Sequence, residues 1–305
     1  MKHPAKKKKS RMTNMQKREA RTGWLFISVW LAGTVFLFIR PLIMSFYYAF
    51  HEVLITAEGL QYKFAGLENF IYKFRDDIYF FSTTFEPALS NFLIDVPIAV
   101  IFSLFIAIIL NQNFKGRTLS RAIFFLPVII TSGIVIQILL TVGLDTDLET
   151  ENTFIFQSGN ITRLLINAGL PHFITDFFME VSNRIFNIVW MSGIQIILYL
   201  SGLQSIPRSE YEAAHIEGAT AWECFWKITW VRVSPITLVV LVYSLIDSFT
   251  NVSNVMIKFV YEEYQQRGNL GGSSALGLMY CMVAFIIIIT AYALASKRVF
   301  YINEN

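Results

Sequence analysis

Six stretches of the chain are each long and apolar enough to cross a lipid bilayer as a helix. They cover residues 24–48, 88–110, 122–143, 185–203, 235–257 and 274–296. A helix needs about 20 mostly apolar residues to span the hydrocarbon core, and lipid offers its backbone no other hydrogen-bond partner. The composition agrees, because 54% of the residues are hydrophobic and 15% are charged. The pattern predicts an all-α integral membrane protein with six transmembrane helices.

Lysine and arginine are distributed unevenly between the loops. If the N-terminus is cytoplasmic, the cytoplasmic pieces carry 17 of these residues and the outer loops carry 7. Cytoplasmic loops hold the excess of positive charge in membrane proteins, so we expect both termini in the cytoplasm. Residues 1–23 then form a basic tail, 24–297 the membrane domain and 298–305 a C-terminal tail. The run KKKKSR at 6–11 fits an anchor to anionic lipid better than a nucleic-acid-binding segment.

Several common catalytic patterns are missing from the sequence. Cys224 and Cys281 are too few for a disulfide framework or a zinc cluster, and the four histidines are scattered. No segment reads GxxxxGK[ST], the loop that cradles nucleotide phosphates. The pair Gly271–Gly272 follows no predicted strand and is interpreted as a loop bend. We therefore expect no enzymatic site, no metal site and no cofactor in this chain.

A charged stretch, LQSIPRSEYEAAHIEGATAWECFWKI, separates the fourth and fifth apolar segments. Ser205 or Ser209 is a candidate N-cap for a short helix. Gly218 suits the left-handed C-terminal cap of that helix. Thr220 and Glu223 have the spacing of a capping box and predict the start of a second helix. The stretch predicts two short helices that meet at a glycine corner, and an ordinary connecting loop is the alternative.

Part of this stretch resembles the EAA loop of ABC importer permeases. That motif reads Glu-Ala-Ala, three residues, Gly, nine residues, Ile, any residue, Leu-Pro. The matching positions here are Glu212, Ala213, Ala214, Gly218 and Ile228. Trp230 and Val231 replace the final Leu-Pro, so the proline bend of the family is not expected at the exit of the loop. The whole loop covers about residues 204–234.

Four further segments resemble, in the same order, the carbohydrate-type permeases related to the maltose importer. They are FAGLENF at 64–70, SRAIFFLPVIITSGIV at 120–135, ITRLLINAGLP at 161–171 and YLSGLQSIPRSEYEAA at 199–214. With the EAA-like loop, they extend the resemblance over about residues 24–300. By this resemblance the chain is identified as a permease subunit of a binding-protein-dependent ABC importer with the type I fold.

The resemblance implies a role for the charged loop. Glu212 would meet a basic residue of a cytoplasmic ATPase, Ala213 and Ala214 would permit close approach, and Gly218 would make the corner. The implied partners are a second, homologous permease subunit, a dimer of ABC ATPases that binds ATP and Mg, and an extracytoplasmic solute-binding protein. The implied location is the bacterial cytoplasmic membrane, which the chain crosses several times, and the implied cargo is a sugar or oligosaccharide.

Polar residues inside membrane segments usually face a bundle interior or a water-filled path. Helical spacing in the fifth segment predicts that one face carries Ser244, Asp247, Ser248, Asn251 and Asn254. The fourth segment places Asn187, Gln195 and Tyr199 roughly on one face. These two faces form the expected substrate path, and the resemblance puts Asn187, Ser244, Ser248 and Asn251 at the sugar pocket of the family. Hydrogen bonding between helices is the alternative explanation of the same residues.

Asp247 could accept hydrogen bonds from sugar hydroxyls or pair with a cation elsewhere in the complex. Two further charged residues inside the apolar segments have no partner that the sequence identifies. Asp95 lies in the second segment, and Arg40 lies before Pro41 in the first, where its side chain can reach the interface. The family pattern of Thr followed by Gly-Gly-Pro after the fifth segment is not visible. Alternative readings are the same machine with a polysaccharide fragment, glycerol phosphate or another polar solute, an ion-driven carrier, or an anchored subunit that transports nothing.

Overall fold

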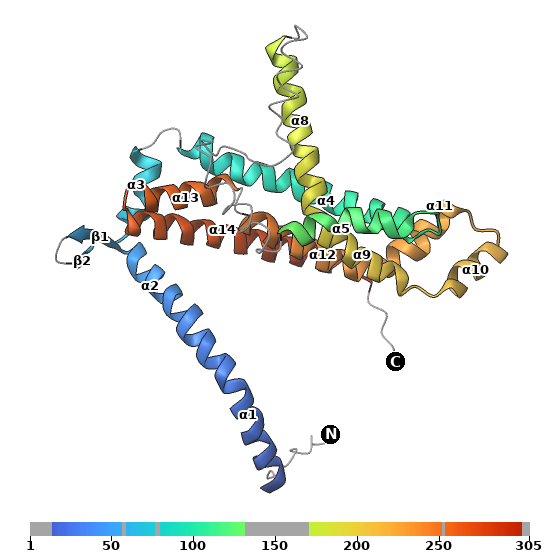
Figure 1. The fold of residues 1–305 in the computed structure, drawn as a ribbon, viewed down its shortest axis with the longest axis horizontal. Coiled ribbons are helices and arrows are strands. Elements are labelled where there is room, and N and C mark those ends of the chain that lie inside the picture. The colour runs from blue at the N-terminus through green and yellow to red at the C-terminus, as the bar shows by residue number, and fades with distance from the viewer. Residues whose placement is uncertain (1–13, 57–58, 77–79, 132–170, 252–253, 301–305) are drawn as a thin grey trace, which may run out of the picture. The chain divides into compact units, whose positions relative to one another are not determined.

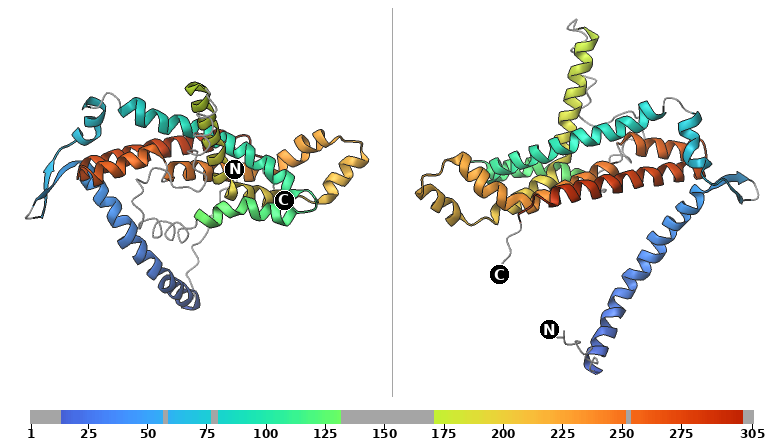
Figure 2. Two further views of the ribbon diagram at one scale, coloured as in Figure 1. Left: turned by 45° about the horizontal axis from the view of Figure 1, so that its top comes forward. Right: turned by 180° about the vertical axis from the view of Figure 1, so that it is seen from behind.

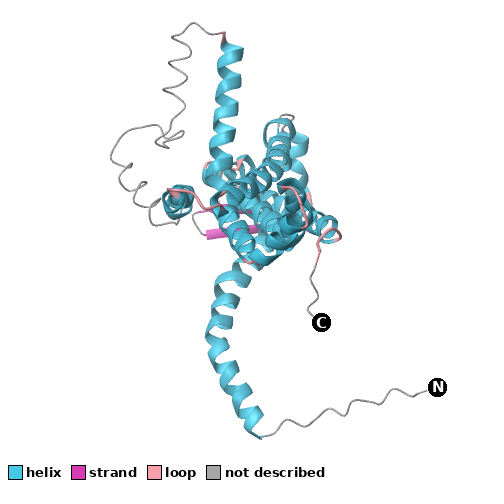
Figure 3. Cartoon of the chain, turned by 90° about the vertical axis from the view of Figure 1, so that its right-hand side faces the viewer, coloured by secondary structure: helices cyan, strands magenta, loops and turns pink. Residues whose placement is uncertain are grey.

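The computed structural model describes residues 14–56, 59–76, 80–131, 171–251 and 254–300. The described chain is helical apart from one two-stranded hairpin (Figure 3). Its contacts divide it into two compact units. Unit one comprises Met1–Ile78 and Phe259–Cys281, and unit two comprises Tyr79–Lys258 and Met282–Asn305.

Unit one begins with a long apolar helix and continues into the hairpin (Figure 1). The helix runs from α1 (Asn14–Thr34) through one π-helical turn, η1 (Val35–Ile39), into α2 (Arg40–Ala49). Strands β1 (His51–Thr56) and β2 (Gly59–Phe64) pair antiparallel, with His51 opposite Phe64. Helix α3 (Glu68–Asp76) follows. Unit one also includes most of α13 (Val255–Gln265) and the first part of α14 (Leu270–Ser296).

The pair Gly271–Gly272 lies in the first turn of α14, so the predicted loop bend is wrong. Glycine is needed there for close packing. A Cβ atom on residue 271 would lie 2.3 Å from the carbonyl oxygen of His51, and one on residue 272 would lie 2.6 Å from the hydroxyl of Tyr72. The glycines therefore let the helix start touch the hairpin and α3, and this close approach could not be read from the sequence.

Unit two contains the remaining helices. They are η2 (Phe81–Phe85), α4 (Glu86–Asn111), α5 (Arg117–Thr131), α8 (His172–Met191), α9 (Gly193–Gln204), α10 (Arg208–Ile216), α11 (Ala221–Cys224), η3 (Phe225–Thr229) and α12 (Trp230–Thr250). The end of α14 completes the unit. Figure 2 shows α10 and α11 together at one end, beyond the long helices.

The core of unit two lies between α4, α9 and α12. Apolar side chains from all three helices are buried in it, among them Ala107, Ile196, Val233 and Val240. Gly202 of α9 permits the approach to α12, because a Cβ atom there would lie 2.8 Å from Cγ1 of Ile236. Close packing of this kind holds membrane helices together, since small residues let their backbones approach.

Within the described residues, four helical stretches are long and apolar enough to cross a membrane: Arg18–Ala49, Phe81–Asn111, Ala221–Gln265 and Leu270–Ser296. The third includes the end of α12 at Thr250 and the start of α13 at Val255. The four stretches contain four of the predicted segments. The predicted segment 122–143 continues past Thr131 and lies partly outside the described residues. The predicted segment 185–203 is divided between α8 and α9, which meet at Ser192. The count of six spans, the side of the termini and the domain bounds stay predictions.

Candidate functional site

Helix α10 carries the Glu-Ala-Ala motif and begins after Pro207, whose backbone is extended. No side chain caps this helix start, so the predicted serine cap is wrong. The hydroxyl of Ser205 is used elsewhere, since it donates to the carbonyl of Gly202 at 2.7 Å. Pro207 occupies the N-cap position with φ −62° and ψ 134°. Its ring fixes this φ, and its side chain has no oxygen that could accept a capping hydrogen bond. Proline geometry rather than serine capping therefore starts α10.

The end of α10 confirms the predicted glycine corner. Gly218 has a φ of +83°. The N–H of Ala219 donates to the carbonyl of Ala214 at 2.9 Å, and the N–H of Gly218 donates to that of His215 at 3.1 Å. This pair of bonds is a Schellman motif, which satisfies carbonyls left open at a helix end. The turn therefore needs the left-handed residue that glycine supplies.

The start of α11 confirms the second predicted cap. The N–H of Glu223 donates to Oγ1 of Thr220 at 3.3 Å, and the N–H of Thr220 donates to Oε2 of Glu223 at 3.0 Å. These reciprocal bonds form a capping box. Helix α11 passes through η3 into α12, so Trp230 and Val231 are helical and Pro235 lies inside α12. The helix therefore leaves the loop without a break.

Two side-chain contacts fasten α10 to η3 and to the first turn of α12. Arg232 forms a bidentate ion pair with Glu210, in which Nε donates to Oε2 at 2.9 Å. The hydroxyl groups of Tyr211 and Thr229 lie 2.8 Å apart. Both contacts join residues about 20 positions apart, so the sequence analysis missed them. They make the helix-turn-helix a braced element rather than a loose connection.

The braced loop leaves one surface of α10 open. Glu212, Ala213 and Gly218 are exposed, and Ala214 is half-buried. Ile216 is 88% exposed, the largest fraction among the exposed large hydrophobic side chains of the described chain. The sequence analysis missed Ile216, although an apolar residue one turn after Glu212 marks the same helix face. A carboxylate, small residues and one bare isoleucine together suit contact with another protein.

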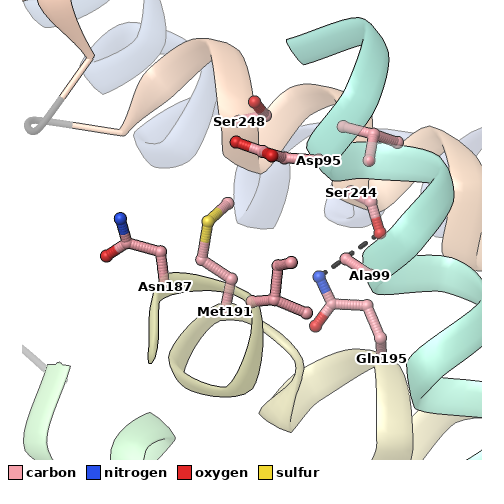
Figure 4. A pocket seen from close by; sticks show the side chains of 9 residues that line it. Asp95, Ala99, Asn187, Met191, Gln195, Ser244 and Ser248 are labelled. Carbon is pink, nitrogen blue, oxygen red and sulfur yellow. Dashed lines mark hydrogen bonds between the residues drawn. The ribbon is translucent and has the colours of Figure 1, made fainter. Parts of the chain in front are cut away.

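A small cavity lies in unit two between α4, the α8–α9 junction and α12 (Figure 4). It is lined by Asp95, Val96, Ala99, Asn187, Ile188, Met191, Gln195, Ser244 and Ser248. Four of the predicted path residues are among them, namely Asn187, Gln195, Ser244 and Ser248. Its volume of about 20 Å3 holds roughly one water molecule. A sugar therefore requires the surrounding helices to separate.

The other predicted path residues lie elsewhere. Tyr199 is buried in the apolar core of unit two, and Asp247 is half-buried on α12 outside the cavity lining. Asn251 follows the end of α12 with an extended backbone, so the predicted continuous face is wrong beyond Ser248. Asn254 lies immediately before α13, and its Oδ1 accepts a hydrogen bond from the N–H of Met256 at 2.9 Å. The helix break removes both asparagines from the shared face.

The cavity is lined by groups that can bind hydroxyls. Gln195 is fully buried, and its Nε2 donates to Oγ of Ser244 at 3.3 Å. Oε1 of Gln195 has no hydrogen-bond partner in the described part of the chain. A buried acceptor without a donor is unfavourable, so this oxygen suits an incoming O–H group. Among the described residues, no group of His, Cys, Asp and Glu could hold a metal ion.

Two curated relatives match most of the chain. "Probable ABC transporter permease protein YesP" of Bacillus subtilis (strain 168) is 29% identical over 238 residues, which cover 76% of this chain and 72% of the relative. "Arabinooligosaccharides transport system permease protein AraP" of Halalkalibacterium halodurans is 25% identical over 308 residues, which cover 93% of this chain and 90% of the relative. The chain is a homologue of sugar ABC transporter permeases. No family model matches it.

A solved structure shows the fold of this permease homologue. One chain of the crystal structure of a bacterial ABC transporter involved in the import of the acidic polysaccharide alginate aligns with a TM-score of 0.63. The alignment covers 92% of this chain and 96% of that chain, at 21% identity. It confirms the prediction of a helical membrane protein with the fold of an ABC importer permease.

Proposed function

We propose that this permease homologue is the transmembrane subunit of an ATP-driven importer that carries a sugar or oligosaccharide across the membrane. The observation that carries the proposal is the braced loop. It combines the Glu-Ala-Ala sequence, the left-handed Gly218 and the exposed Ile216 on one rigid helix-turn-helix. The relationship to AraP supports an oligosaccharide as cargo.

In this proposal the loop transmits motion from a separate ATPase. Glu212 and Ile216 contact a groove of the ATPase, and Ala213 permits close approach. The Glu210–Arg232 pair then passes the displacement to α12, which contributes Ser244 and Ser248 to the cavity. A rigid element of this kind converts domain closure into a shift between two conformations of the membrane helices.

The proposed assembly has four other components. A second permease subunit completes the path, two ATPase subunits hold ATP and Mg, and an extracytoplasmic solute-binding protein delivers cargo. The chain itself carries out no chemistry in this scheme. Its residues provide a conduit and a coupling surface, which agrees with the missing nucleotide-binding pattern of the sequence.

Uptake assays in a host strain deleted for the chain test the proposal. The deletion is complemented with wild type, Glu212→Ala, Gly218→Pro or the control Ser209→Ala, and labelled neutral oligosaccharides, including arabinooligosaccharides, serve as probes. Proline cannot adopt the φ of +83° at position 218. We expect uptake to fall at least ten-fold in the first two variants at equal membrane levels, and to persist in the control, whose hydroxyl caps nothing.

Three outcomes would contradict the proposal. Undiminished uptake in both loop variants would remove the coupling role. Uptake that survives ATP depletion but collapses with an ionophore would support an ion-driven carrier. Equal uptake with and without the chain would support an anchored subunit without a transport role.

A further inference from the structure

The charged residue of the cavity has a partner. Asp95 of α4 lines the cavity, and Nε of Arg184 of α8 lies 3.2 Å from its Oδ1. Both side chains are about one-third exposed. Figure 4 shows Asp95 and Ser248 on one side of the cavity, with Asn187 and Met191 of α8 on the other. The fold thus brings an ionised pair to the place where the uncharged path residues meet.

The pair leaves hydrogen-bonding capacity on the carboxylate. Arg184 attracts Asp95 at ion-pair distance, yet buried Oδ1 of Asp95 has no hydrogen-bond donor in the part of the chain that the structure describes. Oε1 of Gln195 is a second buried acceptor of this kind in the same lining. A carboxylate accepts hydrogen bonds only, and an amide oxygen likewise accepts. Two such acceptors favour a cargo that brings O–H donors.

The charge of the lining is one-sided. Asp95 is the one ionisable side chain among the nine residues that line the cavity, and Arg184 is outside that lining. Arg184 offsets part of the charge of Asp95, but the carboxylate is the partner that lines the cavity. A second negative charge in the cavity therefore lies closer to the carboxylate than to the guanidinium, and between membrane helices that contact is unfavourable. An uncharged sugar meets no such repulsion, while a uronic acid or a phosphorylated sugar does.

We propose that Asp95 selects the cargo of this cavity, by accepting hydrogen bonds from an uncharged sugar and repelling carboxylated or phosphorylated ones. Arg184 is a positioning residue that holds the carboxylate at the cavity. The inference rests on the proposed function and names its substrate class. It places the cargo with neutral oligosaccharides and apart from acidic polysaccharides such as alginate.

Thiol labelling tests the electrostatic part without any transport. Ser248→Cys is introduced into a Cys224→Ser, Cys281→Ser background, and membranes holding the full chain are labelled with cationic or anionic methanethiosulfonate reagents, with and without ATP. We expect the cationic-to-anionic rate ratio to exceed that of free cysteine at least ten-fold. Asp95→Asn should reduce this excess at least five-fold, and Arg184→Gln should increase it. Ser201 is exposed on α9, so Ser201→Cys is the control. Its cationic-to-anionic rate ratio should be the same with and without Asp95→Asn.

Uptake tests the cargo part in the complemented strain. Neutral arabinooligosaccharides and acidic oligogalacturonides serve as probes, and the binding protein is unchanged throughout. We expect wild type to take up only the neutral oligosaccharides. Uptake of these sugars should be at least five-fold lower in Asp95→Asn. Asp95→Glu keeps the charge and should retain more than half of the wild-type uptake.

The outcomes separate the inference from the proposed function. Two labelling results overturn the inference even if sugar uptake is intact. One is a cationic-to-anionic rate ratio at Ser248→Cys that Asp95→Asn does not change. The other is no labelling of the Ser248→Cys variant with or without ATP. Wild-type uptake of oligogalacturonides overturns it as well, although the importer would stand. Absence of ATP-dependent uptake of either class overturns the proposed function, and the cargo role with it.

Discussion

At the residue scale, the Glu210–Arg232 pair decides how firmly the loop is held. The two side chains are 26% and 34% exposed, so solvent screens their attraction in part. The bidentate geometry still restrains both groups more than a single contact would. The pair therefore serves to orient α10 more than to stabilise the fold.

Glu210→Gln tests this role. We expect a stability loss of about 1 kcal/mol or less, as for other partly exposed pairs, but an uptake at least three-fold lower, because α10 loses its ion pair to α12 and keeps only the Tyr211–Thr229 contact. Thermal unfolding in detergent and the uptake assay measure the two effects. Glu217→Gln, an exposed carboxylate on the same loop, is the control. Equal uptake in both variants would contradict the bracing role.

Tyr72 is a second residue whose role only the structure identifies. Its hydroxyl donates to Oε1 of buried Glu263 at 2.7 Å, and Arg267 and Asn269 also bond that carboxylate. Burial and the Glu263 carboxylate raise the pKa of the Tyr72 phenol well above its usual range. The phenol therefore stays a donor, and the stabilisation is complete below the ordinary tyrosine pKa of about 10 and declines above it.

Tyr72→Phe should lower the free energy of unfolding by about 1–3 kcal/mol, because a buried carboxylate loses a donor. The melting midpoint in detergent measures this loss at pH 7. Tyr264→Phe is the control, since that side chain is 47% exposed on the neighbouring helix. Equal midpoints for the two variants would contradict a stabilising role for the bond.

At the element scale, each helix of the loop depends on its own cap. Thr220 closes the capping box of α11 through two reciprocal bonds. We expect Thr220→Ala to cost about 1 kcal/mol and to increase backbone hydrogen exchange over residues 221–224. Thr220→Ser keeps the hydroxyl and should retain the protection. Unchanged exchange in the alanine variant would show that the cap is dispensable.

The start of α14 depends on close approach. Gly271→Ala would place Cβ 2.3 Å from the backbone oxygen of His51. The backbone would have to shift to relieve this contact, which lowers the free energy of unfolding by about 1–3 kcal/mol. Gly277→Ala is the matched control, because its Cβ would lie 3.7 Å from Cγ1 of Val260. Alanine also has a higher helix propensity than glycine. We therefore expect the melting midpoint to fall for position 271 and to hold or rise for position 277.

At the scale of the whole molecule, large apolar surfaces of the described chain are not covered by its own residues. Helix α1 shows this clearly, since Trp24, Phe26 and Trp30 are each at least 67% exposed. Soluble monomers rarely expose apolar patches of such extent. We therefore expect lipid and other subunits to cover the apolar surface that the described chain leaves exposed.

Purification of the tagged chain in mild detergent tests the assembly. We expect wild type to recover a second permease subunit and an ATPase. Gly218→Pro should keep the permease and lose the ATPase, because it disrupts the loop alone. Loss of both subunits would point to a folding defect, and recovery of the ATPase at the wild-type level would contradict its docking on this loop.

Local features could be predicted because they depend on neighbouring residues. The glycine corner at Gly218 and the Thr220–Glu223 box each rest on bonds within one turn. The apolar segments were equally readable, since the requirement for a helix in lipid follows from length and composition. The predicted serine cap of α10 was wrong because Pro207, and not a serine, occupies the N-cap position.

The sequence by itself determined the membrane class, the Glu-Ala-Ala motif and four of the nine cavity-lining residues, because short-range spacing and apolar length carry that information. Only the tertiary structure decided which polar residues meet. It paired Asp95 with Arg184 and Glu210 with Arg232, and it removed Asn251 from the α12 face by ending the helix at Thr250. These contacts join residues distant in the chain, or depend on where a helix breaks, and packing between helices determines both.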